Sequence, residues 1–165
     1  MNWFPAKPSP GGLPFGRLHS LLAVDPSWQQ EPKFDGWRVV VTVLAGEVCI
    51  RTRKGLAVDI YDARIKAALL ELGPCQLDGE LLKRSTLWVF DAPTIPGSLS
   101  DRRAALERMP MREPVRLVPL LEGLAGFDEA LRMGAEGVVL KDRRQQYPRS
   151  HRVGGVTAHW WKVKQ

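Results

Sequence analysis

The sequence predicts an α+β protein whose sheets are mainly antiparallel and are flanked by helices. Two observations favour this class. Short segments that are β-branched, or that alternate polar and apolar residues, follow one another in pairs, and a turn of two or three residues joins each pair, as in β-hairpins. Segments with the apolar spacing of helices separate these pairs.

The first hairpin is expected around Ala45-Gly46, because the segment 37–44, WRVVVTVL, is β-branched and the segment 47–53, EVCIRTR, alternates. The same two periodicities predict strands at 75–82, 86–92, 115–120, 136–142 and 159–164, and helices at 100–109 and 127–133. Lys83-Arg84-Ser85 should form the turn between the first two of these strands, and Gly134 should end the last helix.

A further helix is expected over 60–72, IYDARIKAALLEL. Its apolar residues recur at helical spacing on one face: Ile65, Ala68, Leu69 and Leu72. Asp59 is the expected N-cap, and Gly73-Pro74 should end the helix.

Residues 1–25 are rich in proline and glycine and predict an irregular leader, whereas residues 26–165 are expected to form one domain. No apolar run is long enough for a signal peptide or a membrane span. Cys49 and Cys75 lack metal-ligand spacing and are too few for a disulfide framework, so a reduced, intracellular (cytoplasmic) compartment is expected. We expect a monomer.

The positive charge is concentrated at the end of the chain. Residues 141–165 hold seven Lys or Arg and one acid, and subtracting these from the totals of 24 and 18 leaves 17 of each. A solvated tail is one interpretation, but the segment also contains Tyr147, Trp160 and Trp161. A polyanionic partner, ATP or nucleic acid, is the other. The candidate nucleic-acid-binding residues are Arg143, Arg144, Arg149 and Arg152.

The segment 31–38, EPKFDGWR, is the most informative motif. A lysine next to an Asp-Gly turn also occurs by chance, so a surface turn that enters a strand is the alternative for Lys33. Further motifs follow in order, each on or beside an expected strand: RTRKG at 51–55, LDGEL at 77–81, WVFDAP at 88–93, EGVVLK at 136–141 and WWKVK at 160–164. An ordered set is a more specific signal than any single motif.

Together these motifs resemble those of the covalent nucleotidyltransferases, which include ATP-dependent DNA ligases, RNA ligases and mRNA capping enzymes. The segment 98–109, SLSDRRAALERM, is similar to the L-S-x-R-R-x-x-L helix of ATP-dependent DNA ligases, which makes that family the nearest resemblance. The resemblance covers the chain from about Glu31 onward. It implies the ligase and capping-enzyme fold, ATP and Mg²⁺ (or Mn²⁺) as cofactors, and nicked DNA as acceptor, with RNA as an alternative.

The resemblance assigns a role to each motif residue. Lys33 would attack the α-phosphate of ATP to give lysyl-AMP, and the AMP would then pass to a 5′-phosphate before a 3′-hydroxyl displaces it; a neutral lysine amine suits the first step. The implied nucleotide-binding residues are Glu31, Arg38, Arg53, Glu80, Phe90, Lys141, Lys162 and Lys164. Among these, Glu31 would read the adenine amino group and Phe90 would stack on the base. Glu80 and Glu136 would hold the metal ion.

Several of these residues also have a purely structural interpretation. Phe90 alternates with its neighbours along a strand and could belong to the core, and Lys162 and Lys164 could form a solvated strand face. The aspartates and glycines of these motifs are expected to determine the backbone conformation and not to bind the nucleotide. Asp35 and Asp78 are expected to stabilise turns, and Gly36 and Gly79 are expected to allow close backbone approach.

The sequence reaches residue 165 just after WWKVK, so we expect no OB-fold domain within it. An OB-fold or other clamp protein is therefore an expected partner, and nick sealing without it should be inefficient. The residues before Glu31 are too few for the domain with which NAD-dependent ligases bind nicotinamide mononucleotide, which favours ATP. The alternative functions are an RNA ligase or another RNA nucleotidyltransferase, a guanylyltransferase, and a non-catalytic nucleic-acid-binding module.

Overall fold

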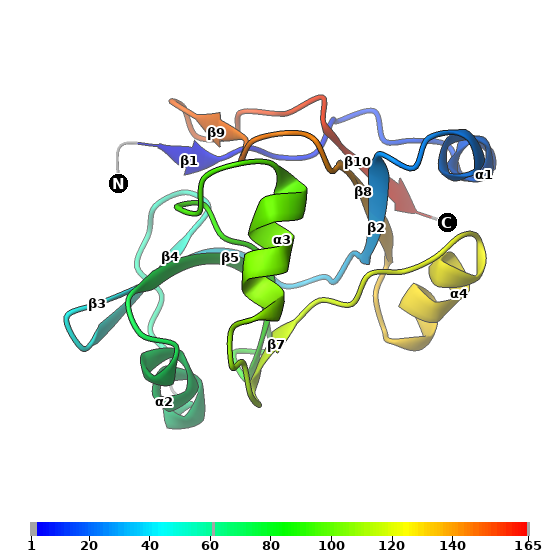
Figure 1. The fold of residues 1–165 in the computed structure, drawn as a ribbon. Helices are drawn as coiled ribbons and strands as arrows, with labels where there is room; N and C mark the ends of the chain where they lie inside the picture. Colours follow the sequence, from blue (N-terminus) through cyan, green and yellow to red (C-terminus); the bar gives the residue numbers. More distant parts are fainter. Residues whose placement is uncertain (1–2, 61, 165) are drawn as a thin grey trace.

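The computed structural model describes residues 3–60 and 62–164. The strands are β1 (Phe4–Pro5), β2 (Trp28–Pro32), β3 (Trp37–Leu44), β4 (Glu47–Thr52), β5 (Cys75–Leu82), β6 (Thr86–Asp91), β7 (Val115–Leu117), β8 (Gly137–Asp142), β9 (Arg149–Ser150) and β10 (Trp160–Lys164). The helices are α1 (Phe15–Val24), α2 (Ala63–Glu71), α3 (Leu99–Glu107) and α4 (Ala125–Arg132) (Figure 1). The α+β prediction is confirmed.

The larger sheet has five strands in the order β4-β3-β5-β6-β7, and every pair but the last is antiparallel. Both predicted hairpins are present. Ala45 and Gly46 turn the chain between β3 and β4, and Lys83 and Arg84 turn it between β5 and β6. All four turn residues have positive φ, as a type I′ turn requires of its central pair.

Helix α2 packs its predicted face, with Ile65, Ala68 and Leu69 buried, against the five-stranded sheet. Asp59 was expected to cap this helix, but the cap is Asp62, whose carboxylate accepts a hydrogen bond from the backbone N–H of Arg64. Asp59 and Asp62 are both residue types that favour an N-cap, so the sequence could not tell which of them begins the helix. Tyr61, part of the predicted helix, lies outside the described residues.

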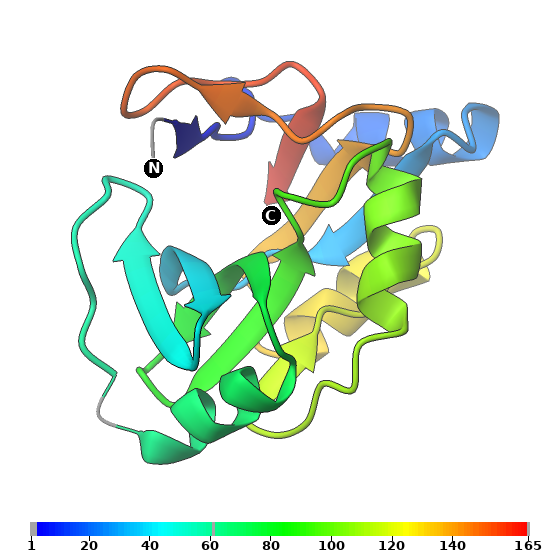
Figure 2. The same cartoon turned by 60° about the vertical axis from the view of Figure 1, so that its left-hand side comes forward.

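The smaller sheet has the order β10-β8-β2, with β8 paired antiparallel on both sides. One face buries Leu140, Val138 and Val163 against α4. The register puts Glu31, Val139 and Lys162 in one row across the other face. In Figure 2, β8 (orange) and β10 (red) lie toward the top of the view, and α2 lies at the bottom beneath the larger sheet.

The irregular leader predicted for residues 1–25 is wrong in two places, because β1 pairs with β9 and α1 packs near β10. Between them the chain runs along the edge of β10, where Ser9 N–H donates to the Trp160 carbonyl and Leu13 N–H donates to the Lys162 carbonyl. Prolines lack an N–H, and Pro8, Pro10 and Pro14 are neighbours of these two donors, at positions where no N–H is used in this way. The leader therefore satisfies backbone groups that an edge strand leaves open.

Helix α3 starts at Leu99, one residue before the predicted start, because Ser98 and Asp101 form a capping box. Arg102 of this helix is buried and donates two hydrogen bonds to Asp91 at the end of β6. The Ser100 N–H donates to the Arg143 carbonyl, so α3 is bonded to segments of both larger sheets. Of the helices that the structure describes, none has the length and apolar character that a membrane span requires.

Candidate nucleotide site

A pocket of about 600 Å³ is lined by residues of both larger sheets and of the β2–β3 connection. Its volume falls within the ~300–1,000 Å³ of typical small-molecule sites. The lining residues are Pro8, Glu31, Pro32, Lys33, Phe34, Asp35, Gly36, Trp37, Arg38, Thr52, Arg53, Lys54, Leu56, Glu80, Phe90, Val118, Val139, Lys141 and Trp160.

Lys33 follows β2 and is held at the wall of this pocket by its own backbone. Its N–H donates to the Gly137 carbonyl at 2.8 Å, and its carbonyl accepts from the Glu136 N–H at 2.9 Å. Its ammonium forms an ion pair with the Glu136 carboxylate, which also accepts from Lys164 at 2.5 Å. Partial burial opposes ionisation of Glu136, but hydrogen bonds and charges from Lys164 and Lys33 outweigh it and lower the pKa of this carboxyl group.

Glu80 of β5 lies on the other sheet and holds the turn after Lys33. Its Oε1 accepts from the Gly36 N–H at 3.1 Å. Burial raises the pKa of Glu80 to about 7, although Arg38, the Gly36 N–H and Lys33 all act in the opposite direction. Gly36 is required here, since a Cβ at this position would lie 2.6 Å from the Leu81 carbonyl oxygen, and the predicted close approach is confirmed.

Arg38 forms a bidentate pair with Asp78, with Nε–Oδ1 at 3.1 Å and NH2–Oδ2 at 2.7 Å. Asp78 also accepts from the Tyr147 hydroxyl at 2.5 Å and is fully buried, so the prediction that it stabilises a turn is wrong. The guanidinium lies 5.4 Å and 5.0 Å from the ring centroids of Phe90 and Trp160. Burial disfavours the charged form of Arg38, but the interaction with Asp78 outweighs burial and raises the pKa of the guanidinium. Arg38 is therefore positively charged beside these two aromatic rings.

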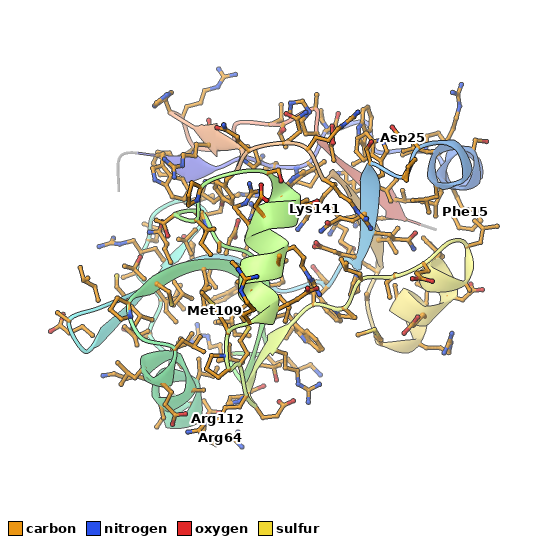
Figure 3. All side chains as sticks on the ribbon, in the orientation of Figure 1. Phe15, Asp25, Arg64, Met109, Arg112 and Lys141 are labelled. Carbon is orange, nitrogen blue, oxygen red and sulfur yellow. The ribbon has the colours of Figure 1, made fainter. Side chains whose placement is uncertain are left out.

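Glu31 and Lys141 form the deepest charged pair of the pocket, at 2.5 Å, and each is 2% exposed. The Gln29 amide donates to the other carboxylate oxygen of Glu31 at 2.6 Å. Figure 3 shows Lys141 well inside the molecule, unlike Arg64 and Arg112. Its Nζ lies 4.3 Å from the Phe90 ring centroid and 4.6 Å from that of Trp160, so two aromatic rings and one carboxylate surround the ammonium.

Arg53 lines the pocket beyond the end of β4, and its Nε is buried without a hydrogen-bond partner among the described residues. Buried polar groups almost always find a partner, so an unsatisfied guanidinium nitrogen in a pocket wall calls for an acceptor. Lys54 lies next to it in the lining. This part of the pocket is suited to an anion.

Comparison with solved structures places the fold. A mycobacterial DNA ligase D complexed with ATP and MES is 26% identical, with a TM-score of 0.77 over 99% of this chain and 60% of that one. The ligase domain of M. tuberculosis LigD gives the same identity and TM-score over 99% and 59%. Chlorella virus DNA ligase-adenylate is 18% identical, with a TM-score of 0.59 over 100% and 67%. Neither a protein-family model nor a curated protein sequence matches.

This chain matches the nucleotidyltransferase domain of ATP-dependent ligases. It spans about 60% of the length of the two ligase D chains. The resemblance inferred from the ordered motifs is therefore confirmed at the level of the fold.

The nucleotidyltransferase fold gathers most of the predicted nucleotide-binding residues in one pocket: Glu31, Arg38, Arg53, Glu80, Phe90 and Lys141, together with Lys33. Glu136 and Lys164 are outside the lining, but Glu136 forms an ion pair with Lys33, and Lys164 forms an ion pair with Glu136. Lys162 is also outside the lining. It is half-buried on the row that contains Glu31.

The donor set fits a magnesium ion only if the nucleotide supplies ligands. Among residues 3–60 and 62–164 there is no group of three or more His, Cys, Asp or Glu side chains that could hold a metal. Mg²⁺ commonly uses one or two carboxylates, its own waters and substrate phosphates. Glu136 pairs with Lys33, and the Lys33 charge also acts on Glu80, so both predicted ligands are near the nucleophile.

The four arginines predicted to bind nucleic acid are not part of the pocket. Arg144 pairs with Asp142 at 2.9 Å, and Arg149 donates to the Pro93 carbonyl at 2.7 Å. Arg143 and Arg152 are exposed. Their role in binding nucleic acid stays a prediction.

Sequence reasoning missed Trp160, Tyr147 and Pro8 as parts of this site. Trp160 was noted only as an aromatic residue of the final segment, yet it lines the pocket beside Phe90. Its two-residue spacing from Lys162, along a strand, was a usable signal that both share a face. Tyr147 and Pro8 reach the site through pairings distant in sequence, and no local pattern marks them.

Proposed function

We propose that this chain is the adenylating unit of an ATP-dependent polynucleotide ligase and that Lys33 is its nucleophile. The position of Lys33 carries the proposal. Its backbone is bonded to the start of β8, its ammonium is paired with Glu136, and its side chain lines a pocket of about 600 Å³. A nucleophile held in one place next to a bound substrate reacts without first losing orientational freedom.

In the first step the neutral Lys33 amine attacks the α-phosphorus of ATP. A P–N bond forms, the bond from that phosphorus to the bridging oxygen breaks, pyrophosphate leaves, and the amine gives up its proton to water. Arg53 and Lys54 line the pocket, and Lys164 is joined to Lys33 through Glu136. These cations would bind the phosphates and offset the charge of the transition state.

The adenosine would occupy the part of the pocket between Phe90, Glu31 and Lys141. Phe90 is half-buried and offers a ring for stacking, and Glu31 offers a carboxylate acceptor for the adenine amino group. Glu80 and Glu136 would hold Mg²⁺ or Mn²⁺ together with ATP oxygens. The bound metal ion supplies charge stabilisation at the transferred phosphate.

The second and third steps require a nucleic-acid acceptor, for which we propose nicked DNA. AMP would pass from Lys33 to the 5′-phosphate, and a 3′-hydroxyl would then displace AMP to seal the nick. The two neighbours at 26% identity are DNA ligases, which favours DNA over RNA. We expect a partner with an OB-fold or another clamp to increase sealing.

The decisive experiment is adenylation of the purified chain with α-labelled ATP and Mg²⁺, followed by a denaturing gel and mass spectrometry. The wild type should carry one AMP on Lys33, and Lys33→Ala should carry none. Lys66→Ala, which changes an exposed lysine on α2, should label like the wild type. An unlabelled wild type, or equal label on Lys33→Ala, would refute the proposal.

The same assay separates the alternatives. Label from GTP in place of ATP would indicate a guanylyltransferase. Faster AMP transfer to 5′-phosphorylated RNA than to nicked DNA would indicate an RNA ligase. Nucleic-acid binding that decreases steeply with salt, in a protein that never takes up label, would indicate a non-catalytic module.

A further inference from the structure

The Arg38 side chain is held from two directions within the chain. Its Nε and Nη2 donate to the two oxygens of Asp78, and its Nη1 donates to the Ala6 carbonyl at 2.6 Å. A guanidinium carries one N–H at Nε and a pair at each terminal nitrogen, so among the described residues these bonds leave one N–H on each terminal nitrogen. Because Arg38 lines the nucleotide pocket, Asp78 and the Ala6 carbonyl determine where these remaining donors point.

The Asp78 carboxylate is held in turn by Tyr147. The Tyr147 hydroxyl donates to Asp78 Oδ2 at 2.5 Å, and both side chains are buried. Burial and the charge of Asp78 raise the pKa of the Tyr147 hydroxyl well above its usual value, so the hydroxyl keeps its proton and acts as a donor. Arg38 Nη2 bonds to the same carboxylate oxygen. Tyr147 therefore restricts the position of the carboxylate that orients Arg38.

The Ala6 carbonyl is directed at Arg38 by the other side of its own peptide. The N–H of that peptide belongs to Lys7 and donates to the Gly155 carbonyl at 2.7 Å. A trans peptide is planar and its N–H and C=O point in opposite directions, so the bond to Gly155 turns the Ala6 carbonyl toward Arg38. The Lys7 carbonyl also accepts from the Thr157 N–H at 2.8 Å. The leader is therefore bonded to the final segment on both sides of the group that contacts Arg38.

The leader and Tyr147 are also in contact with each other. The Trp3 ring meets the Tyr147 ring edge to face, with the ring centroids 5.4 Å apart. β1, which follows Trp3, lies beside β9, which follows Tyr147 (Figures 1 and 2). Neither Ala6 nor Tyr147 lines the pocket. Their hydrogen bonds lead to it through Arg38, directly from Ala6 and by way of Asp78 from Tyr147.

We propose that Tyr147 and the peptide between Ala6 and Lys7 position Arg38 to bind ATP, with the remaining N–H groups of Arg38 donating to nucleotide oxygens. The inference deepens the proposed function and rests on it. A donor that is already oriented loses little freedom when its ligand arrives, so preorganisation increases affinity. Tyr147 and the leader are thus positioning groups, and Arg38 is the residue that meets the nucleotide.

Two variants of the full chain each remove one support. Tyr147→Phe removes only the hydroxyl that bonds to Asp78. Its control is Thr42→Val, which removes a hydroxyl from the strand that carries Arg38; that hydroxyl accepts from the Gln76 amide, and neither residue lines the pocket.

Lys7→Pro removes the N–H that bonds to the Gly155 carbonyl and so releases the peptide whose carbonyl accepts from Arg38. Lys7→Ala is the matched control, because it removes the same side-chain charge and keeps the N–H. Urea unfolding of all four variants gives the loss of stability that each change causes by itself.

Single-turnover labelling of Lys33 over a range of ATP concentrations gives the half-saturating concentration and the maximal rate. Tyr147→Phe and Lys7→Pro should each raise the half-saturating concentration by roughly tenfold, the order of effect of one hydrogen bond to a charged group. The maximal rate should change much less, because the lost contact holds ATP before and during the reaction alike. Lys7→Ala and Thr42→Val should keep the wild-type half-saturating concentration.

The same changes in an Arg38→Lys background separate positioning from a general structural role. Lysine keeps the charge but lacks the planar, forked guanidinium, so it cannot be oriented by Asp78 and Ala6 together. Tyr147→Phe and Lys7→Pro should therefore add little to the effect of Arg38→Lys. An effect through Trp160, whose ring centroid lies 6.4 Å from that of Tyr147, would persist in this background.

An unchanged half-saturating concentration in Tyr147→Phe or in Lys7→Pro would overturn the inference, and so would an equal fold increase in the Arg38→Lys background. Failure of the proposed function gives a different result, because wild-type Lys33 then takes up no AMP. Equilibrium dialysis with labelled ATP, on the same variants made in a Lys33→Ala chain, still decides in that case whether Tyr147 and the leader support nucleotide binding through Arg38.

Discussion

The Lys33 ammonium is ion paired with the Glu136 carboxylate, 103 residues further along the chain. The two residues also meet through their backbones, because the Glu136 N–H donates to the Lys33 carbonyl. Lys164 of β10 pairs with the same carboxylate. Three segments of the chain thus fix one amine at the wall of the pocket.

The variant Glu136→Gln should slow adenylation of Lys33 by about a hundredfold, because a loss of position of this kind has that order of effect. The amide has nearly the same shape but no charge, so the Lys33 side chain is no longer held by an ion pair. Single-turnover labelling at saturating ATP measures the rate. Glu129→Gln, on the exposed side of α4, is the control and should label at the wild-type rate.

A magnesium titration of the same variant separates two roles of Glu136. If the carboxylate only positions Lys33, the maximal rate falls and the Mg²⁺ concentration for half-maximal rate stays the same. If it also holds the metal ion, as we propose, that concentration rises as well. A wild-type rate in Glu136→Gln would contradict both roles.

Glu80 predicts a specific pH dependence of stability. Burial raises its pKa from 4.5 to about 7 in the folded chain, against the influence of Arg38 and Lys33. The folded state therefore binds this proton more tightly than the unfolded state, so the stabilisation is complete below about pH 4.5 and is lost as pH rises through about 7. In Glu80→Gln this loss is absent. Between those pH values the free energy of unfolding should shift in favour of the variant by up to roughly 3 kcal/mol.

Urea denaturation of Glu80→Gln and the wild type from pH 5 to pH 8 measures this difference. Glu47→Gln, at an exposed position at the start of β4, should run parallel to the wild type. If Glu80→Gln also runs parallel to the wild type, the carboxyl group has an ordinary pKa. The conclusion that burial raises the pKa of Glu80 would then be wrong.

The parts of the fold that could be predicted from the sequence have local signals. The strands around Ala45-Gly46 and the buried face of α2 follow directly from side-chain periodicity. The ordered motifs also assigned Lys33, Glu80 and Phe90 to one nucleotide site, and all three line the same pocket. Each of these motif residues lies on or beside a strand, so the pairing of the strands brings the three side chains together.

The parts that could not be predicted depend on partners far away in the chain. β2, WQQEP, contains no β-branched residue and ends in proline, yet it is a buried strand because β8 pairs with it. Asp78 follows a turn-like pattern, but its partners are Arg38 and Tyr147. The number of charges in the final segment likewise gives no sign that the Arg149 guanidinium donates a hydrogen bond to the Pro93 carbonyl.

Gly36→Ala should affect both stability and adenylation. The added methyl group would lie 2.6 Å from the Leu81 carbonyl oxygen and 2.7 Å from Leu82 Cδ2, so the backbone after Lys33 must move. We expect a loss of about 1–3 kcal/mol in the free energy of unfolding and slower labelling of Lys33. Gly11→Ala is the matched control, because no atom lies within 4 Å of its Cβ position.

Denaturant unfolding and single-turnover labelling test this prediction on the two glycine variants. Wild-type values for Gly36→Ala in both measurements would mean that the β2–β3 connection can shift without cost. The steric account of the glycine would then be wrong. A stability loss without slower labelling would separate the packing of Gly36 from the position of Lys33.

The Asp91–Arg102 pair should behave as a buried unit. Its side chains are 0% and 1% exposed, with Nε–Oδ1 at 2.6 Å and NH2–Oδ2 at 3.1 Å. Removing one partner leaves the other charge buried, so Arg102→Met or Asp91→Asn alone should cost about 3–5 kcal/mol. Arg108→Ala, an exposed change just past the end of α3, should stay within about 0.5 kcal/mol of the wild type.

The double variant, Asp91→Asn with Arg102→Met, gives the sharper test. With both charges removed, no charge is left buried and unpaired, so it should be much less destabilised than the sum of the two single variants. Arg102 also donates to the carbonyls of Gly97 and Gln145, at 3.0 Å and 3.2 Å, and these acceptors lose their donor in the double variant. Some destabilisation should therefore remain. Additive losses in denaturant unfolding would mean that the two side chains stabilise α3 independently and not as an ion pair.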